Sequence, residues 1–253
     1  MKVHHLNCVE IQSPTGDRAI GHCILIQRKK QLILVDAGIS SQDLADPNLH
    51  FTEVLIQQVG FNFNAIQSAK DQILNLGLNP LDVTDIVLSH LDCDHSSGLL
   101  DFPKAKIHVA QEELTSFYKP EARYLDFVLQ HRPLIQTYGP STDTWLGFEA
   151  RYLALHPDLS LALIPLFGHT LGHCGVAFTI EKQTYFYVGD AYYLRAELTD
   201  PLHPVHELTK ARAADNIQRL FNLERLKVFV VDHPEICVFG YHDAEEWDNC
   251  RNT

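Results

Sequence analysis

The sequence contains no apolar stretch that approaches the roughly 20 residues needed to cross a bilayer, so we expect no transmembrane helix. Its N-terminus lacks the basic start and apolar block that are typical of a signal peptide. None of the six cysteines forms a Cys-x-x-Cys pair. Without a secretion signal, these thiols are expected to be reduced. Together these absences predict a protein of the cytoplasm.

Basic residues are also scarce, with 20 Lys and Arg against 32 Asp and Glu and a net charge of -12. The longest basic cluster is Arg28-Lys29-Lys30, which lies between two apolar runs and is interpreted as a hairpin turn. A protein that binds a phosphate backbone needs a basic face. We therefore expect a small-molecule substrate, and neither nucleic acid nor a membrane as a partner.

The length of 253 residues, of which 45% are hydrophobic, allows one large domain or two small ones. There is no low-complexity tract and no linker. We expect a single domain over residues 1–253.

Local patterns predict strands alternating with helices. Two hairpins are expected, at 19–27 with 32–36 and at 176–181 with 184–188. Further strands are expected at 85–89, 106–110, 161–166 and 227–232, and helices at 65–76, 111–118 and 210–223. Segment 41–63 has no clear period, and 121–140 is expected to be helical in part. This mixture predicts sheets covered by helices, with the strand-end loops converging on one edge.

The run His90-Leu91-Asp92-Cys93-Asp94-His95 places four metal-capable side chains in six residues, at the end of a predicted strand. In an extended segment, residues 90, 92 and 94 would point the same way, and Cys93 would point away and pack. A tight turn would then bring His95 to a second metal. Imidazole with carboxylate suits zinc, iron or manganese. A solvated acidic turn is the alternative interpretation.

This run resembles the His-x-His-x-Asp-His signature of the metallo-β-lactamase superfamily. Other motifs, one before this run and three after it, resemble that family in the same order: Asp36-Ala37-Gly38, Gly168-His169-Thr170-Leu171-Gly172-His173, Gly189-Asp190 and His242-Asp243. The resemblance implies an α/β fold, a four-layer αβ/βα sandwich in which two mixed β-sheets are flanked by helices.

The resemblance also implies a binuclear site for two divalent metal ions, zinc above all. It assigns His90, Asp92 and His169 to the first metal, Asp94, His95 and His242 to the second, and Asp190 to both. His233, at the end of the predicted strand 227–232, is the alternative to His242. His173 is expected to be structural, Asp36 to orient a ligand, and His22 either to do the same or simply to pack.

Within the superfamily, the sequence is most similar to the N-acyl-homoserine lactonase branch, through segment 41–63 and the Asp190–Tyr193 run. This similarity implies hydrolysis of an ester-like carbonyl, above all a lactone. Tyr193 would donate a hydrogen bond to the carbonyl oxygen, and Asp94 would pass a proton to the leaving group. A packed aromatic is the alternative for Tyr193. Aromatic residues in 41–63 and 117–138 are expected to wall an apolar pocket or to lie in the core.

Asp92 departs from the family, which usually has histidine at this place. Three carboxylates and a hydroxide against two divalent ions give a net charge of zero, so the bridging water should be less acidic. The harder ligand should make iron or manganese competitive with zinc. Three alternatives stay open: a thioester hydrolase, which the acidic C-terminus disfavours, an oxidoreductase, and a metal-holding binding protein with little activity.

Overall fold

The computed structural model describes residues 1–13, 16–120 and 123–251. Two sheets form its centre. The six-stranded sheet has the order β1 (Lys2–Gln12), β2 (Arg18–Arg28), β3 (Gln31–Val35), β4 (Val83–Val87), β5 (Lys106–Ala110) and β6 (Leu134–Tyr138). The five-stranded sheet has the order β13 (Cys237–Phe239), β12 (Gln183–Tyr187), β11 (Cys174–Ile180), β10 (Ser160–Pro165) and β9 (Arg151–Tyr152). A small hairpin pairs β7 (Thr144–Trp145) with β8 (Phe148–Glu149).

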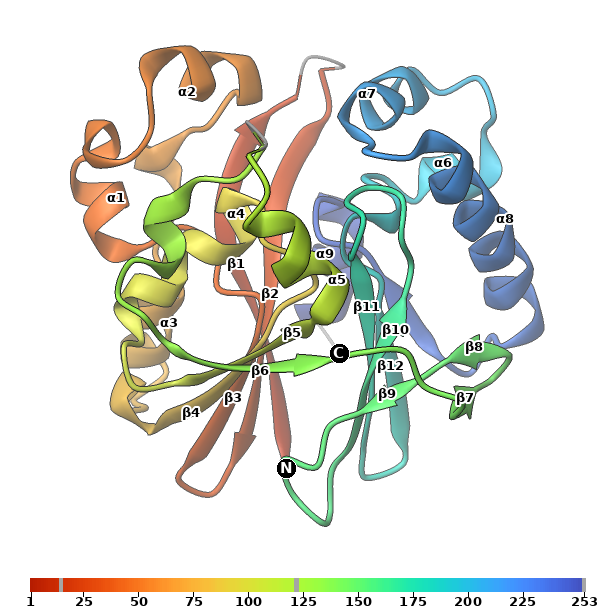
Figure 1. The fold of residues 1–253 in the computed structure, drawn as a ribbon, viewed down its shortest axis with the longest axis horizontal. Coiled ribbons are helices and arrows are strands. Elements are labelled where there is room, and N and C mark those ends of the chain that lie inside the picture. The colour runs from red at the N-terminus through yellow and green to blue at the C-terminus, as the bar shows by residue number, and fades with distance from the viewer. Residues whose placement is uncertain (14–15, 121–122, 252–253) are drawn as a thin grey trace.

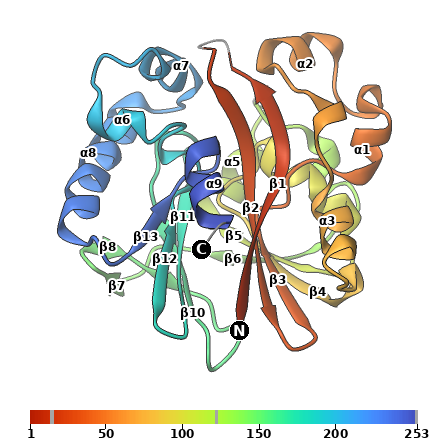
Figure 2. The ribbon, with the colours of Figure 1, turned by 180° about the vertical axis from the view of Figure 1, so that it is seen from behind.

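Both sheets are mixed. In the first, β1 to β3 pair antiparallel and β3 to β6 pair parallel. In the second, β9 to β12 pair antiparallel, and β13 adds to β12 in parallel. Figures 1 and 2 show helices on the outer side of each sheet. The six-stranded sheet is flanked by α1 (Ser41–Ala45), α2 (Glu53–Val59) and α3 (Ala69–Asn75), and the five-stranded sheet by α6 (Ala196–Thr199), α7 (Val205–Arg212) and α8 (Asn216–Asp232). The expected four-layer sandwich is confirmed.

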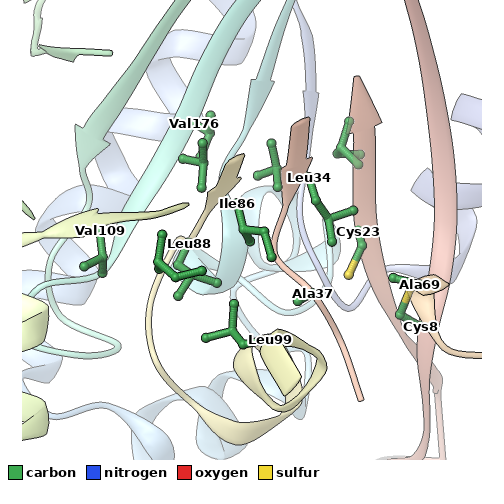
Figure 3. Close-up of a cluster of buried hydrophobic side chains, with 14 of the residues drawn as sticks. Cys8, Cys23, Leu34, Ala37, Ala69, Ile86, Leu88, Leu99, Val109 and Val176 are labelled. Carbon is green, nitrogen blue, oxygen red and sulfur yellow. The ribbon is translucent and has the colours of Figure 1, made fainter. Parts of the chain in front are cut away.

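The main core lies between the two sheets. Leu34 and Ile86 of the first sheet belong to the same buried cluster as Val176 of the second, and Figure 3 shows them near one another. Strand β2 is buried at eight consecutive positions, from Ala19 to Ile26. A strand covered on both faces needs apolar residues without alternation. Its sequence therefore reflects its central place in the sandwich.

The remaining helices lie at the ends of strands. Helix α4 (Cys93–Ser96) follows β4, α5 (Gln111–Phe117) follows β5 directly, and α9 (Ala244–Arg251) follows β13. The turn after α4 packs closely on the chain that leaves β3, because a Cβ at Gly98 would lie 2.1 Å from the Ala37 carbonyl oxygen. Only glycine fits there without displacement.

The expected strand at 227–232 is wrong, since these residues form the C-terminal part of α8. The run of β-branched residues suggested a strand, but the buried residues of α8 are spaced by three or four: Arg219, Asn222, Leu223, Leu226 and Phe229. Burial on one helical face outweighs β propensity here. The last strand is β13 instead.

The expected helix at 210–223 is divided in two. Helix α7 ends at Arg212, and α8 begins after Asp215, whose side chain accepts hydrogen bonds from the backbone N–H groups of Ile217 and Gln218. Such an N-cap starts a new helix. Among the helices in the described part of the chain, none is long and apolar enough to cross a membrane.

Candidate metal centre

Four strand-end segments converge on one edge of the sandwich. The turn after β4 carries His90, and α4 carries Asp94 and His95. The turn after β10 carries His169, the short 3-10 helix Gly189–Ala191 after β12 carries Asp190, and the loop after β13 carries His242. Each loop begins where a buried strand stops, so the rigid sheets fix its position. The expected convergence of strand-end histidines and aspartates is confirmed.

These side chains form two groups of three. His90, His169 and Asp190 make the first, and Asp94, His95 and His242 make the second; within each group the candidate ligand atoms lie within 4.8 Å of one another. Asp190 lies between them. Its Oδ2 is 3.2 Å from His169 Nε2 and 3.4 Å from His242 Nε2, and its Oδ1 is 3.4 Å from His95 Nε2.

The donor set fits divalent cations. Among the described residues, the buried atoms without a hydrogen-bond partner include His90 Nε2, His95 Nε2 and Asp190 Oδ1, all in this cluster. Buried polar atoms are rarely left unpaired. Three such atoms facing one small space, together with imidazole and carboxylate neighbours, match the ligand chemistry of zinc and similar ions.

The electrostatics of the cluster are strongly coupled. Burial lowers the pKa of His95, but the carboxylates of Asp190, Asp94 and Asp36 outweigh burial and raise that pKa well above its ordinary value. Burial raises the pKa of Asp190, but His242, His95 and His169 outweigh it and hold that pKa well below its usual range. The Asp190 carboxylate is therefore ionised at neutral pH and attracts positive charge.

Neighbouring groups fix the orientation of the imidazoles. Asp36 Oδ2 is 2.8 Å from His95 Nδ1, and the same carboxylate accepts hydrogen bonds from Ser89 and from the hydroxyl of Tyr187. His242 Nδ1 lies 2.9 Å from the Ile20 carbonyl oxygen. With the proton on Nδ1, each ring presents its Nε2 lone pair to the cluster. Asp36 thus has the orienting contact that was expected of it.

Two other histidines lie outside the ligand groups. His173 Nε2 accepts a hydrogen bond from the backbone N–H of Asp190 at 2.9 Å, and its Nδ1 contacts the Leu166 carbonyl oxygen, so it holds the loop that carries Asp190. His22 contacts His5 and the ring of Phe239 and touches none of the cluster. It is a packed residue.

His233 lies away from the cluster. It follows α8 as the C-cap residue, and its Nδ1 is 3.3 Å from Glu235. The strand end that made it an alternative to His242 does not exist. His242 is the histidine that the fold brings to Asp94 and Asp190, at 3.7 and 3.4 Å.

The conformation of the His90–His95 run differs from the extended segment that we expected. Asp92 is the residue before α4, and Asp94 and His95 lie in its first turn. Alternation therefore does not decide which side chains share a face. Cys93 is buried, as expected of a packing residue, but it also lines the cavity over the cluster.

Asp92 is held by an arginine that no motif in the sequence marks. Arg123 Nε donates to Asp92 Oδ1 at 2.7 Å and Nη2 to Oδ2 at 2.5 Å. Burial raises the pKa of Asp92, but Arg123 outweighs it and holds that pKa well below its usual range. Asp92 Oδ2 still lies 3.1 Å from His169 Nε2 and 3.4 Å from His90 Nε2. Asp92 therefore lies beside the first group but is paired with a guanidinium.

A cavity of about 290 Å³ opens over the cluster. Asp92, Asp94, Asp190, Tyr193 and His242 line it, and its apolar lining comes mainly from β1, α2 and α7. Of the aromatic residues expected in this wall, only Phe61 lines the cavity. Phe51, Phe117, Tyr124 and Phe127 are buried in the core instead. The wall is therefore largely aliphatic: Ile11, Leu55, Val59, Val205 and Leu208.

A four-layer sandwich with imidazoles and carboxylates gathered at its strand ends defines a class of metal-binding protein. The chain belongs to the metallo-beta-lactamase superfamily, whose family model matches residues 16–233. The class that was expected, a metal-dependent hydrolase, is confirmed. A probable metallo-hydrolase of Mycobacterium tuberculosis is 30% identical over 269 aligned positions, which cover 100% of this chain and 84% of that relative.

Lactonases are also among the similar proteins. The N-acyl homoserine lactonase AttM of Agrobacterium fabrum is 25% identical over 192 positions, which cover 74% of this chain and 68% of AttM. A crystal structure of a Bacillus thuringiensis AiiA variant with N-decanoyl-L-homoserine bound has a TM-score of 0.76 at 20% identity, covering 99% of this chain and 96% of that one. The dizinc quorum-quenching lactonase AidC has a TM-score of 0.60 at 18% identity, covering 90% and 74%.

Proposed function

We propose that this protein is a binuclear metal-dependent hydrolase that opens a lactone, or a closely related ester, with an apolar substituent. Two divalent ions would be held by the seven residues expected from the sequence: His90, Asp92 and His169 for the first, Asp94, His95 and His242 for the second, and Asp190 for both. We propose that residues 1–253 act as one domain, in the cytoplasm.

The observation that carries this proposal is the mixed lining of the cavity over the cluster. Asp94, Asp190 and His242 line it together with aliphatic side chains of β1, α2 and α7. A small substrate with a reactive carbonyl and an apolar chain matches this combination. The names of the lactonase relatives support the same substrate class.

The chemistry that bound divalent ions supply in such sites is a hydroxide formed near neutral pH and polarisation of a carbonyl oxygen. Tyr193 lines the cavity, and its ring centroid is 4.9 Å from that of His242 and 5.7 Å from that of His169. Burial and the charge of Asp190 raise the pKa of Tyr193 well above its ordinary value. The phenol therefore keeps its proton and donates a hydrogen bond to the carbonyl oxygen as negative charge develops.

The position of Asp94 supports a role for its carboxylate toward the leaving group. Its side chain is 14% exposed, and its Oδ2 lies 3.8 Å from His95 Nε2 and 3.7 Å from His242 Nε2. It is therefore the carboxylate of the second group that faces the cavity. We propose that Asp94 carries the proton to the departing alkoxide.

We propose zinc as the resident metal, with iron and manganese as competitors because of the carboxylate of Asp92. Elemental analysis of protein purified without added metal tests this point. Two equivalents of zinc from iron-replete cells would exclude the competitors.

The function is tested on a panel of N-acyl-homoserine lactones, aryl esters and thioesters, with protein loaded with zinc, manganese or iron. We expect turnover of lactones. Turnover should be faster with longer acyl chains, because a longer chain buries more apolar surface against the aliphatic wall. Faster turnover of thioesters would replace the lactone by that class, and no turnover of any compound would favour a binding protein.

Two histidine variants tie the activity to this site. His242→Ala removes a proposed ligand and should abolish turnover. His233→Ala should leave turnover unchanged, because the His233 side chain pairs with Glu235 and packs on Phe229 of α8, away from the ligand groups. Equal losses in both variants would count against the proposed ligand set.

A further inference from the structure

Arg123 is the one cation that the described residues bring into hydrogen-bond contact with the two ligand groups or Asp92. It lies between α5 and β6 in the sequence, and its guanidinium contacts three other segments of the chain. Two of its hydrogen bonds go to Asp92, one goes from Nη1 to the backbone carbonyl oxygen of Arg212 at 2.6 Å, and Nη2 lies 2.6 Å from His169 Nε2. The α7 carbonyl thus also holds the guanidinium, and Arg123 and Arg212 both line the cavity.

The contact with His169 is the informative one. An imidazole nitrogen has a single lone pair, and it either accepts an N–H bond or binds a metal. Arginine carries only donors and keeps its charge. His169 Nε2 also lies 3.1 Å from Asp92 Oδ2. With the imidazole proton on Nδ1, the tautomer that binds a metal through Nε2, the Nη2 group is directed at the lone pair that His169 Nε2 would offer to a divalent ion, and it also covers Asp92 Oδ2.

The second group has no such basic side chain among the described residues. Asp94, His95 and His242 contact Asp190, Asp36 and backbone or hydroxyl groups, and none of the described lysine or arginine side chains hydrogen-bonds to them. Among the described residues, the Nε2 atoms of His90 in the first group and His95 in the second both lack a hydrogen-bond partner, so the difference between the groups is the guanidinium on His169 and Asp92. The two positions therefore differ in how readily they accept a cation.

We propose that Arg123 is a built-in cation at the first metal position, which competes with a divalent ion for His169 and Asp92, so that the second position fills first. The inference rests on the proposed binuclear function and adds an order of loading to it. Arg123 is a positioning residue in this scheme. The guanidinium must leave His169 before the first position fills, and Nε can keep its bond to Asp92 Oδ1 when it does.

The test is a zinc titration of chelator-treated protein, followed by calorimetry and by competition with a chromophoric chelator. For the unchanged protein we expect two steps, one tight and one weak. In Arg123→Gln the weak step should tighten by about 10-fold to 100-fold, the range by which groups next to metal ligands change affinity, and the tight step should stay where it is. Cobalt(II) spectra should show the change only at the second equivalent.

Arg212→Gln is the matched control. It removes one positive charge from the same cavity, but its guanidinium contacts the Gln58 carbonyl oxygen and none of the ligand groups. Both steps should be unchanged in this variant. Arg123→Lys keeps the charge without the two-pronged geometry, and it should shift the weak step in the same direction by less. It also serves if Arg123→Gln does not fold.

Three outcomes would overturn the inference: a weaker second step in Arg123→Gln, equal shifts in Arg123→Gln and Arg212→Gln, or fewer than two zinc ions bound by every variant. The first would mean that the guanidinium supports Asp92 as a ligand. A protein that shows the expected titrations and turns over no lactone would contradict the proposed function alone.

Discussion

Replacing Asp36 with asparagine should lower the free energy of unfolding and weaken metal binding at the proposed second position. Asp36 is fully buried and joins the two sheets, because Tyr187 of β12 and His95 of α4 both contact its Oδ2. Ser89 donates its hydroxyl to Oδ2 at 2.7 Å and its backbone N–H to Oδ1 at 2.8 Å. The backbone of Asp36 has a φ of 52°, which both aspartate and asparagine tolerate. The substitution therefore adds no backbone strain, and its effect comes from the side chain alone.

The size of the effect follows from these donors. An amide oxygen can take the place of Oδ2, but the amide NH2 then faces the fixed backbone N–H of Ser89. An unsatisfied buried donor costs about 1–3 kcal/mol. Loss of the negative charge also weakens the contact with His95, so we expect a total loss of about 2–4 kcal/mol in the free energy of unfolding. If the amide turns the other way, His95 must move its proton to Nε2, the atom that faces the cluster.

The assay combines urea unfolding in the presence of a chelator with a zinc titration. Asp36→Asn should lower the unfolding free energy by about 2–4 kcal/mol and weaken the second metal position by about 10-fold to 100-fold. Tyr187→Phe is the control, since it removes one donor and should cost about 1 kcal/mol without changing metal affinity. If Asp36→Asn instead unfolds within about 1 kcal/mol of the unchanged protein, with equal zinc affinity, the reasoning is refuted.

Three further changes have directions that the structure defines. Gly98→Ala places a Cβ 2.1 Å from the Ala37 carbonyl oxygen and should lower the unfolding free energy by about 1–3 kcal/mol, visible as a lower urea midpoint at unchanged slope. Burial lowers the pKa of His5 to about 4, so its contribution to stability is complete above pH 6.5 and declines as the pH falls toward 4, by up to roughly 3 kcal/mol. His5→Gln should make that decline shallower in urea titrations at several pH values, and burial of His22, which also lowers its pKa, should supply the decline that is left. Tyr193→Phe should lower kcat by about 10²-fold with a small change in KM, and an unchanged kcat would reduce Tyr193 to a packed aromatic.

The sequence predicted best those elements that depend on residues close to one another along the chain. Strand β5 has the expected bounds, Lys106–Ala110, because a short apolar run between polar residues predicts a buried strand. The loops of the site follow strands of this kind, so the placement of His169 and Asp190 could be predicted. The same reasoning failed at residues 227–232, where single-residue β propensity competes with a burial pattern that only the complete α8 reveals.

Arg123 could not be predicted because its role depends on contacts far along the chain. It pairs with Asp92 across 31 positions, with His169 across 46 and with the backbone of Arg212 across 89. No spacing rule connects such residues, and a single arginine in an aromatic segment carries no motif. The sequence showed that Asp92 replaces the usual histidine of the family signature, but only the structure identifies Arg123 as its partner.

Arg123 changes the charge balance that Asp92 alone predicts for the proposed metal centre. With two divalent ions at the proposed positions, three carboxylates and a hydroxide would sum to zero, whereas the guanidinium of Arg123 would restore a net charge of +1 while Nε stays on Asp92 Oδ1. That is the charge expected with a neutral histidine in place of Asp92. We therefore expect a metal-bound water to be less acidic in Arg123→Gln than in the unchanged protein. The acid limb of the activity–pH curve should move to higher pH in Arg123→Gln and stay in place in Arg212→Gln; an acid limb that stays in place in both would show that Arg123 does not balance Asp92.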